Sequence, residues 1–124
     1  TTVINTGIDL IPTVCELAGI EYPENEYHGL SIVPVATGKA DGIERRYIFT
    51  ESENWFQVIE DGRYKYTVLE TQDTGEILVD LKNDPGEMRN LSGDHDYAGI
   101  QDRLRAVLEQ ELESRGIQLK LKTN

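Results

Sequence analysis

The sequence predicts an α+β fold, in which a small antiparallel sheet of three to four strands carries a C-terminal helix on one face, with a further helix near the N-terminus. Three observations support this prediction. Two runs of strand-forming residues flank Asp61-Gly62, a pair typical of a two-residue hairpin turn. A short apolar run, Ile77 to Leu81, ends at a turn that contains Pro85-Gly86. Near the C-terminus, apolar residues recur at the spacing of an amphipathic helix.

The N-terminal helix is expected from Ile8 to Ala18, with Thr6 as its N-cap and Gly19 at its end. Because proline is tolerated only in the first turn, Pro12 could delay the regular helix to Ile11. Apolar residues lie nearly all round this helix: Ile8, Leu10, Ile11, Val14, Cys15, Leu17 and Ala18. Such a helix is buried on nearly all sides, and so short a chain cannot cover it. The sequence therefore predicts a larger parent domain or a tight oligomer around it.

Residues 21–40 are predicted to be mostly a connection, with one short helical turn within Ser31 to Thr37, because prolines, glycines and scattered charges interrupt them. Sheet follows, with strands expected at Tyr47–Thr50, Trp55–Glu60, Arg63–Leu69 and Ile77–Leu81. A turn at Asp73-Thr74-Gly75 precedes the last strand. In the Arg63 strand, Tyr64, Tyr66 and Val68 share one face and Arg63, Lys65, Thr67 and Leu69 share the other.

The last helix is predicted from about Tyr97 to Arg115. Its apolar stripe, which should pack on the sheet, contains Ile100, Leu104, Val107, Leu108 and Leu112. The residues expected to face away are Arg103, Arg105, Glu109, Gln110 and Glu113. Glu111 and Arg115 have the spacing of an ion pair on a helix. Gly116 and Ile117 should close the helix as a Schellman motif.

The composition, 38% hydrophobic and 28% charged, suits a soluble globular chain, and 124 residues are too few for more than one complete domain. The apolar runs are too short to span a membrane. The chain begins at Thr1 and has no signal peptide, which favours a processed or truncated piece of a longer protein. The net charge of -11 disfavours nucleic acid as a partner, because phosphate binding needs clustered basic residues.

Two segments of the N-terminal part contain recognisable motifs. The segment from Gly7 to Ile20 has the pattern D-L-x-P-T-x-x-x-L-A-G-I, and the segment from His28 to Pro34 has the pattern G-x-S-L-x-P with Ile32 in place of the leucine. Both motifs resemble those of the sulfatases, which belong to the alkaline-phosphatase-like superfamily. The residues at matching positions, for which we expect structural roles, are Asp9, Pro12, Thr13, Gly29 and Ser31.

Two later motifs extend the resemblance over nearly the whole chain. Asp61 to Tyr66 resembles x-G-R-Y-K-Y, and Leu78 to Leu91 resembles the signature L-Y/V-D-L, two residues, D-P-x-E, two residues, N-L. The matching residues, again expected to be structural, are Arg63, Tyr64, Lys65, Asp80, Asp84, Pro85, Glu87 and Asn90. Asp84 is expected to accept backbone hydrogen bonds in its turn. Glu87 could do the same or pair with Arg89, Arg63 or Lys65.

The resemblance implies that residues 1–40 form the end of an α/β sulfatase catalytic domain and a link, and that residues 41–124 form a C-terminal α+β subdomain. In this family a formylglycine, made from the Cys or Ser of a C/S-x-P-x-R motif, attacks sulfur beside a divalent cation, usually calcium. Cys15 precedes Glu16-Leu17-Ala18 and is not that residue. We therefore expect no catalytic residue, metal ligand or cofactor in this chain. The formylglycine and the divalent cation are expected in its parent.

The resemblance also implies the partners and the compartment. The expected partners are the remainder of the parent sulfatase and, in the parent, a sulfated small molecule or glycan. Because such a substrate is an anion and the chain is acidic, the site that binds sulfate must come mainly from another part of the enzyme. Self-association through the exposed first helix is the expectation for the chain alone. Members of the family are typically periplasmic, lysosomal or secreted.

Few side chains are candidates for binding. Glu51, Asn54 and Trp55 lie in a loop that could shape a substrate cleft, with Trp55 stacked on a sugar ring, although a Trp55 buried under the sheet is at least as good an interpretation. His28 has no second ligand nearby and is expected at the surface. Asp94-His95-Asp96 resembles metal ligands, but a loop that caps the next helix explains it better.

Three functions remain open from the sequence. The first is a C-terminal piece of a sulfatase whose parent hydrolyses aryl or carbohydrate sulfate esters. The second is a piece of a phosphonate or phosphate ester hydrolase of the same superfamily. The third is a free-standing, non-catalytic module that binds carbohydrate or protein.

Overall fold

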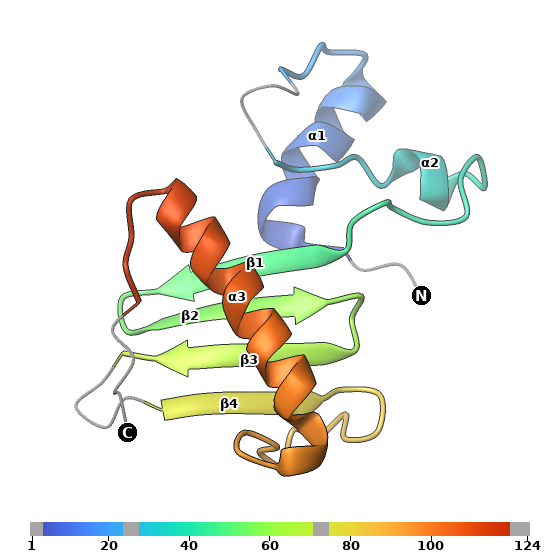
Figure 1. Ribbon diagram of the computed structural model, residues 1–124. Coiled ribbons are helices and arrows are strands. Elements are labelled where there is room, and N and C mark those ends of the chain that lie inside the picture. Colours follow the sequence, from blue (N-terminus) through green and yellow to red (C-terminus); the bar gives the residue numbers. More distant parts are fainter. Residues whose placement is uncertain (1–3, 24–27, 71–74, 120–124) are drawn as a thin grey trace. The chain divides into compact units, whose positions relative to one another are not determined.

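The structure is a computed structural model of the chain, and it describes residues 4–23, 28–70 and 75–119. The chain forms two compact units, residues 1–45 and 46–124, whereas the sequence places a division between residues 40 and 41 (Figure 1). The first unit contains α1 (Thr6–Ala18) and the short α2 (Val33–Ala36). The second contains the sheet, a 3-10 turn called η1 (His95–Tyr97) and α3 (Ala98–Ser114).

The ends of α1 follow from local capping chemistry. The N-cap is Asn5, not the predicted Thr6: the Asn5 side chain accepts a hydrogen bond from the backbone N–H of Gly7 at 3.0 Å. Thr6 is instead the first helical residue. Gly19 ends the helix in the left-handed conformation, with φ of 67°, as the sequence predicts.

Pro12 lies inside α1, so the prediction that a proline delays the helix to Ile11 is wrong. Proline cannot donate to the carbonyl group of Ile8, four residues earlier. Gly29 lies directly against this carbonyl group: a Cβ atom at position 29 would stand 2.8 Å from the Ile8 carbonyl carbon and would overlap its oxygen. The close approach explains why position 29 has no side chain.

The sheet has four antiparallel strands in the order β1-β2-β3-β4, each paired with the next in sequence (Figure 1). The predicted meander is therefore confirmed, in its four-stranded form. The strands are β1 (Tyr47–Ser52), β2 (Trp55–Glu60), β3 (Tyr64–Leu69) and β4 (Gly75–Asp80). Asp61, Gly62 and Arg63 join β2 to β3, one residue more than in the predicted two-residue turn. Asp61 and Gly62 have φ of 47° and 64°, as the two central residues of a type I′ turn require. Asp73 and Thr74 of the turn predicted before β4 lie outside the described residues.

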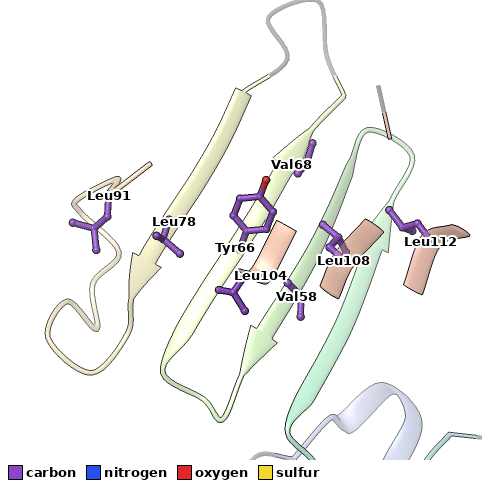
Figure 2. Packing of buried hydrophobic residues seen from close by; sticks show 8 residues of the cluster. All are labelled: Val58, Tyr66, Val68, Leu78, Leu91, Leu104, Leu108 and Leu112. Atoms are coloured by element: carbon purple, nitrogen blue, oxygen red, sulfur yellow. The ribbon is translucent and has the colours of Figure 1, made fainter. Parts of the chain in front are cut away.

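The hydrophobic core lies between this sheet and α3, which crosses one of its faces (Figures 1 and 2). The register aligns Val58, Tyr66 and Leu78 in one row across β2, β3 and β4. Leu104 and Leu108 of α3 pack in the same cluster. Its buried members are Val58, Tyr66, Val68, Leu78, Leu91, Leu104, Leu108 and Leu112. Burial of each leucine side chain contributes roughly 1.5–3 kcal/mol, so this cluster is the main source of stability of the second unit.

The polar residues of α3 differ from the prediction. Arg103 and Arg105 do not face away, because their guanidinium groups reach the sheet and pair with Glu60 and Glu76. Arg115 pairs with Glu51 of β1, at 2.7 Å to each carboxylate oxygen, and not with the predicted Glu111. A long arginine side chain can cover apolar surface while its charged end reaches a partner on the sheet, which helical spacing alone does not reveal.

The C-terminal end of α3 forms the predicted Schellman motif. Gly116 has φ of 74°, and its N–H donates to the Glu113 carbonyl at 2.9 Å. The N–H of Ile117 donates to the Leu112 carbonyl at 2.9 Å. Within the described residues, no helix is long and apolar enough to cross a membrane.

Candidate functional site

The surface of α1 is inverted relative to that of an ordinary surface helix. Its buried residues are Asp9, Pro12 and Thr13, which belong to the first motif. Its large apolar side chains are exposed instead, and they are Ile8, Leu10, Ile11, Val14 and Leu17. Leu17 is 70% exposed and Leu10 63% exposed. An apolar face of this size marks a surface that another part of a protein covers.

Asp9 is the centre of the buried polar cluster in the first unit. Its carboxylate accepts hydrogen bonds from Arg45 at 2.7 Å to each oxygen. The backbone N–H groups of Asn5 and Leu30 donate to the same carboxylate at 2.7 and 2.9 Å. Burial alone would raise the pKa of Asp9, but the hydrogen bonds from Arg45, Leu30 and Asn5 outweigh it, so this pKa lies below its ordinary value.

The first two motifs meet in this unit. Thr13 donates from its hydroxyl to the Asp9 carbonyl and accepts from the backbone N–H of Ile32 at 3.1 Å. The Ser31 hydroxyl accepts from the N–H of Val33, the first residue of α2, at 3.2 Å. The Asp-x-x-Pro-Thr residues therefore hold the segment that follows Gly29. Beside them lies a cavity of about 310 Å³, lined by Ile4, Thr6, Asp9, Leu10, Thr13 and Ile32.

The two later motifs meet at one end of the sheet. Asp80 accepts from Arg63 at 3.3 Å and from Asn83 Nδ2 at 2.9 Å. Lys65 of β3 forms an ion pair with Glu87, one of the three partners that the sequence leaves open. Burial lowers the pKa of Lys65. Glu87 has φ of 54°, a left-handed conformation that is uncommon outside glycine. The ion pair holds the turn after β4 against β3.

The remaining motif residues close the turn and the edge of the sheet. Asp84 accepts from the backbone N–H of Arg89 at 2.8 Å, and Pro85 follows it. The Asn90 side chain accepts from the N–H of Leu78 at 3.0 Å and donates to the Glu76 carbonyl at 3.0 Å. The Asn90 side chain thus satisfies the hydrogen-bonding capacity of two backbone groups of β4, which as an edge strand would otherwise leave them unpaired. These contacts join the turn after β4 to the edge of the sheet.

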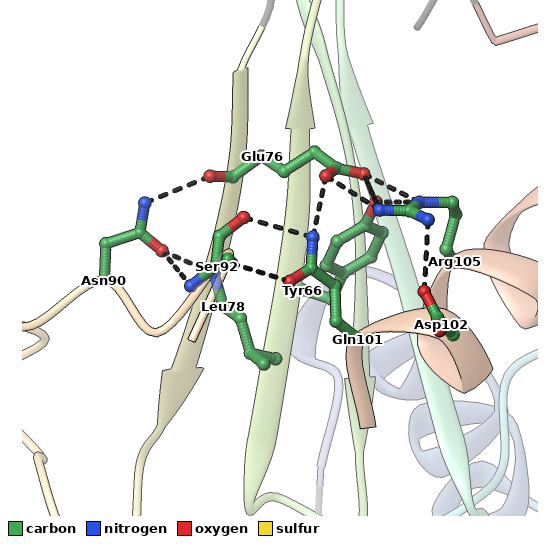
Figure 3. A network of polar contacts seen from close by, with 9 residues as sticks. Tyr66, Glu76, Leu78, Asn90, Ser92, Gln101, Asp102 and Arg105 are labelled. Atoms are coloured by element: carbon green, nitrogen blue, oxygen red, sulfur yellow. Dashed lines mark hydrogen bonds and ion pairs between the residues drawn. The ribbon is translucent and has the colours of Figure 1, made fainter. Parts of the chain in front are cut away.

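A polar network that the sequence does not predict joins α3 to β3 and β4 (Figure 3). Arg105 pairs with Glu76 at 2.8 Å through both Nε and Nη2, and the Tyr66 hydroxyl contacts the same carboxylate. Gln101 donates to Glu76 at 2.7 Å and accepts from Gly93 N–H at 3.0 Å. Burial, and then the hydrogen bond to Glu76, raise the pKa of Tyr66. The sequence does contain one indication that Gln101 is buried: it lies three residues before Leu104, on the buried stripe of the helix.

The candidate binding loop lies at the hairpin between β1 and β2. Glu51 and Asn54 are exposed, and Trp55 is half-buried. The Glu51 carboxylate is already held by Arg115. The Asn54 carbonyl accepts from the N–H of Glu70 at 2.8 Å, which fixes the backbone at this position. The register pairs Trp55 with Ser52 and Leu69, so its ring is on the sheet face opposite Val58.

The described residues do not fit a catalytic metal or a formylglycine. Among them, no three His, Cys, Asp or Glu side chains lie close enough together to hold a metal ion. Cys15 is half-buried on α1 and lacks the motif from which formylglycine is made. His28 is exposed. Asp94 caps η1, because its side chain accepts from the N–H of Asp96 at 3.1 Å.

Comparison with known proteins gives one consistent family. The model of the C-terminal part of N-sulphoglucosamine sulphohydrolase matches residues 1–114. A Delta 4,5-hexuronate-2-O-sulfatase of Bacteroides thetaiotaomicron is 36% identical over an alignment of 109 positions, which covers 82% of this chain and 22% of the relative. An ulvan-active sulfatase of Formosa agariphila is 30% identical over an alignment of 131 positions, which covers 77% of this chain and 26% of the relative.

A solved structure shares the fold as well as the sequence. The structure of a 2-O GAG sulfatase superimposes with a TM-score of 0.71 at 32% identity, over 94% of this chain and 27% of that protein. The chain thus spans between 22% and 27% of the length of these sulfatases. Because the family match extends over residues 1–114, this chain belongs to the family of C-terminal N-sulphoglucosamine sulphohydrolase domains, within the sulfatases.

Proposed function

We propose that the chain is the C-terminal part of a carbohydrate sulfatase and serves it as a scaffold rather than as a source of catalytic groups. The observation that carries this proposal is the inverted surface of α1, with Asp9 buried and Leu17 exposed. A helix with this distribution needs an apolar layer on its outer side. We propose that the remainder of the sulfatase supplies this layer and is the partner of residues 1–40.

The substrate class is proposed from the relatives. They act on a hexuronate 2-O-sulfate and on ulvan, and the solved relative is a 2-O sulfatase of GAG. A sulfated glycan is therefore the proposed substrate of the longer protein. Its formylglycine and its divalent cation, which we expect to be calcium, belong to the remainder of that protein. Phosphonate or phosphate ester hydrolysis, and binding without catalysis, are less well supported, because the three relatives above are sulfatases.

Within this scaffold, the hairpin between β1 and β2 is the proposed contribution to substrate choice. Asn54 and Trp55 present an amide and a partly exposed indole ring, which suit the hydroxyl groups and the flat face of a sugar. Glu51 is proposed to act mainly through Arg115, which fixes the hairpin to the end of α3.

The test is sulfate release from defined sulfated disaccharides, measured by ion chromatography, with the longer protein that contains this chain. We expect calcium-dependent release from a 2-O-sulfated uronate or a sulfated hexosamine. A longer protein that leaves every sulfate ester intact and hydrolyses phosphonate or phosphate esters would contradict the proposal.

A further inference from the structure

Two arginine side chains of the second unit share a single carboxylate. Elsewhere in the described chain the usual arrangement is one arginine to one carboxylate, as in the pairs Arg63–Asp80, Arg89–Asp94 and Arg115–Glu51. Arg46 and Arg103 both pair with Glu60, and no other carboxylate of the described residues pairs with either of them. The group of three therefore has one positive charge in excess.

The geometry fixes both guanidinium groups at one point. Oε1 of Glu60 accepts from Nε and Nη2 of Arg46 at 3.2 and 3.0 Å. Nη1 of Arg103 contacts the same oxygen atom. The Arg46 guanidinium also lies over the ring of Tyr47, 5.3 Å from its centre. Three elements thus hold the group: the start of β1, the end of β2 and the second turn of α3.

The excess charge is on the solvent side. The Glu60 side chain is only 7% exposed, whereas those of Arg46 and Arg103 are 62% and 40% exposed. Each guanidinium has five N–H donors, and the contacts with Glu60 use only part of them. Paired guanidinium groups with free donors match the oxygen atoms of a sulfate or carboxylate group.

We propose that Arg46 and Arg103 together bind an oxyanion, and that this oxyanion is a sulfate or carboxylate group of an acidic glycan. The net charge of -11 repels anions from most of the chain, so a preformed positive site is what an acidic glycan needs in order to approach it. The identification of the ligand as a glycan rests on the proposed function. The binding of an oxyanion rests on the geometry of Arg46, Arg103 and Glu60 alone.

The test is calorimetric titration of the purified 124-residue chain with sodium sulfate and with a heparin tetrasaccharide, at low ionic strength. The variants are Arg46→Gln and Arg103→Gln. Arg89→Gln is the matched control, because it removes the same charge from a side chain that is 70% exposed and has its own carboxylate. We expect each of the first two variants to lose affinity by about fivefold or more, and the control to stay within about twofold.

Equal weakening in all three variants would overturn the proposal, because it would indicate general attraction rather than a site. Absence of binding of both probes to the unaltered chain would overturn it as well. Binding of sulfate without tighter binding of the tetrasaccharide would support the oxyanion site and overturn the glycan as its ligand. Circular dichroism verifies the fold, and if Arg103→Gln loses helix signal, the more exposed Arg46→Gln decides alone. Failure of the proposed function would show separately, as absent sulfate release by the longer protein.

Discussion

Arg45 donates hydrogen bonds from both terminal nitrogens of its guanidinium group to the buried carboxylate of Asp9, at 2.7 Å each. Their side chains are 9% and 1% exposed. The next residue, Arg46, pairs with Glu60 in the second unit. The two consecutive arginines are therefore each tied to a carboxylate in a different unit. Asp9 belongs to the first sulfatase motif, and Arg45 is the last residue of the first unit. Their ion pair therefore connects the motif to the end of that unit.

Replacing Arg45 should strongly destabilise the first unit. Arg45→Ala would leave the Asp9 carboxylate buried and without its charge partner, which costs about 3–5 kcal/mol. The control is Arg89→Ala, whose partner Asp94 is at the surface and whose loss should cost no more than about 1 kcal/mol. Urea unfolding monitored by circular dichroism compares the two variants. Similar midpoints would show that the Asp9 pair contributes little.

Acid should destabilise the protein through carboxylates that arginine side chains keep ionised. Asp9 and Glu76 have pKa values held below their ordinary values of 3.8 and 4.5. In each case hydrogen bonds and charge from an arginine exceed the opposing effect of burial. A depressed pKa contributes stability that is fully present above the ordinary value and is lost as the pH falls through the folded value. Urea midpoints should therefore fall steadily below about pH 4.5.

The Asp9→Asn variant is the control for this pH dependence. It should be less stable than the unaltered chain at pH 6 and should lose less stability on acidification, because one depressed carboxyl group is gone. Parallel curves for the two proteins would exclude Asp9 as a source of acid sensitivity.

Removing the turn acceptor at Asp84 should affect stability and not chemistry. Asp84→Ala loses the hydrogen bond from the Arg89 N–H, and a loss of about 1–2 kcal/mol is expected. In the longer protein, turnover per folded molecule should stay nearly unchanged while the melting temperature falls. A variant that melts normally and loses most of its turnover would place this turn in the active site.

The exposed face of α1 should drive association of the isolated chain. Burial of one leucine-sized side chain is worth roughly 1.5–3 kcal/mol, and several are exposed on this helix. Leu10→Glu and Leu17→Glu should shift light-scattering masses toward the monomer. Glu16→Gln, on the same helix, should not. A strict monomer at high concentration with full helix signal would contradict this prediction.

Trp55 should affect glycan substrates more than small ones. In the longer protein, Trp55→Ala is expected to raise KM for a sulfated oligosaccharide by about tenfold, since stacking on a ring is worth roughly 0.5–1.5 kcal/mol beyond area burial. An aryl sulfate, which has no sugar ring to stack on Trp55, should be hydrolysed as before. Equal effects on both substrates, together with a lower melting temperature, would assign Trp55 to the fold instead.

The fold could be predicted because local chemistry determines most of it. Asp61-Gly62 specifies its hairpin turn through two positive φ angles, and Gly116 specifies the end of α3 in the same way. Leu104 and Leu108 identify the buried stripe by spacing alone. None of these predictions required knowledge of contacts between distant residues.

Long-range polar pairing could not be predicted in this way. Arg103 and Arg105 have helical positions that suggest solvent, yet their long side chains reach carboxylates on β2 and β4. Arg45 is thirty-six positions from Asp9, and nothing local marks it as the partner. Conversely, the motif residues near Asp84 were correctly placed in a turn, because proline and glycine constrain the backbone there.

The most direct test of the scaffold account measures sulfate release by the chain of 124 residues alone and by the longer protein that contains it, on the same sulfated disaccharide with calcium present. The account predicts release by the longer protein and none by the chain alone, because the described residues hold neither the nucleophile motif nor a cluster of metal ligands. Turnover by the isolated chain, lost on chelation of the metal, would contradict it.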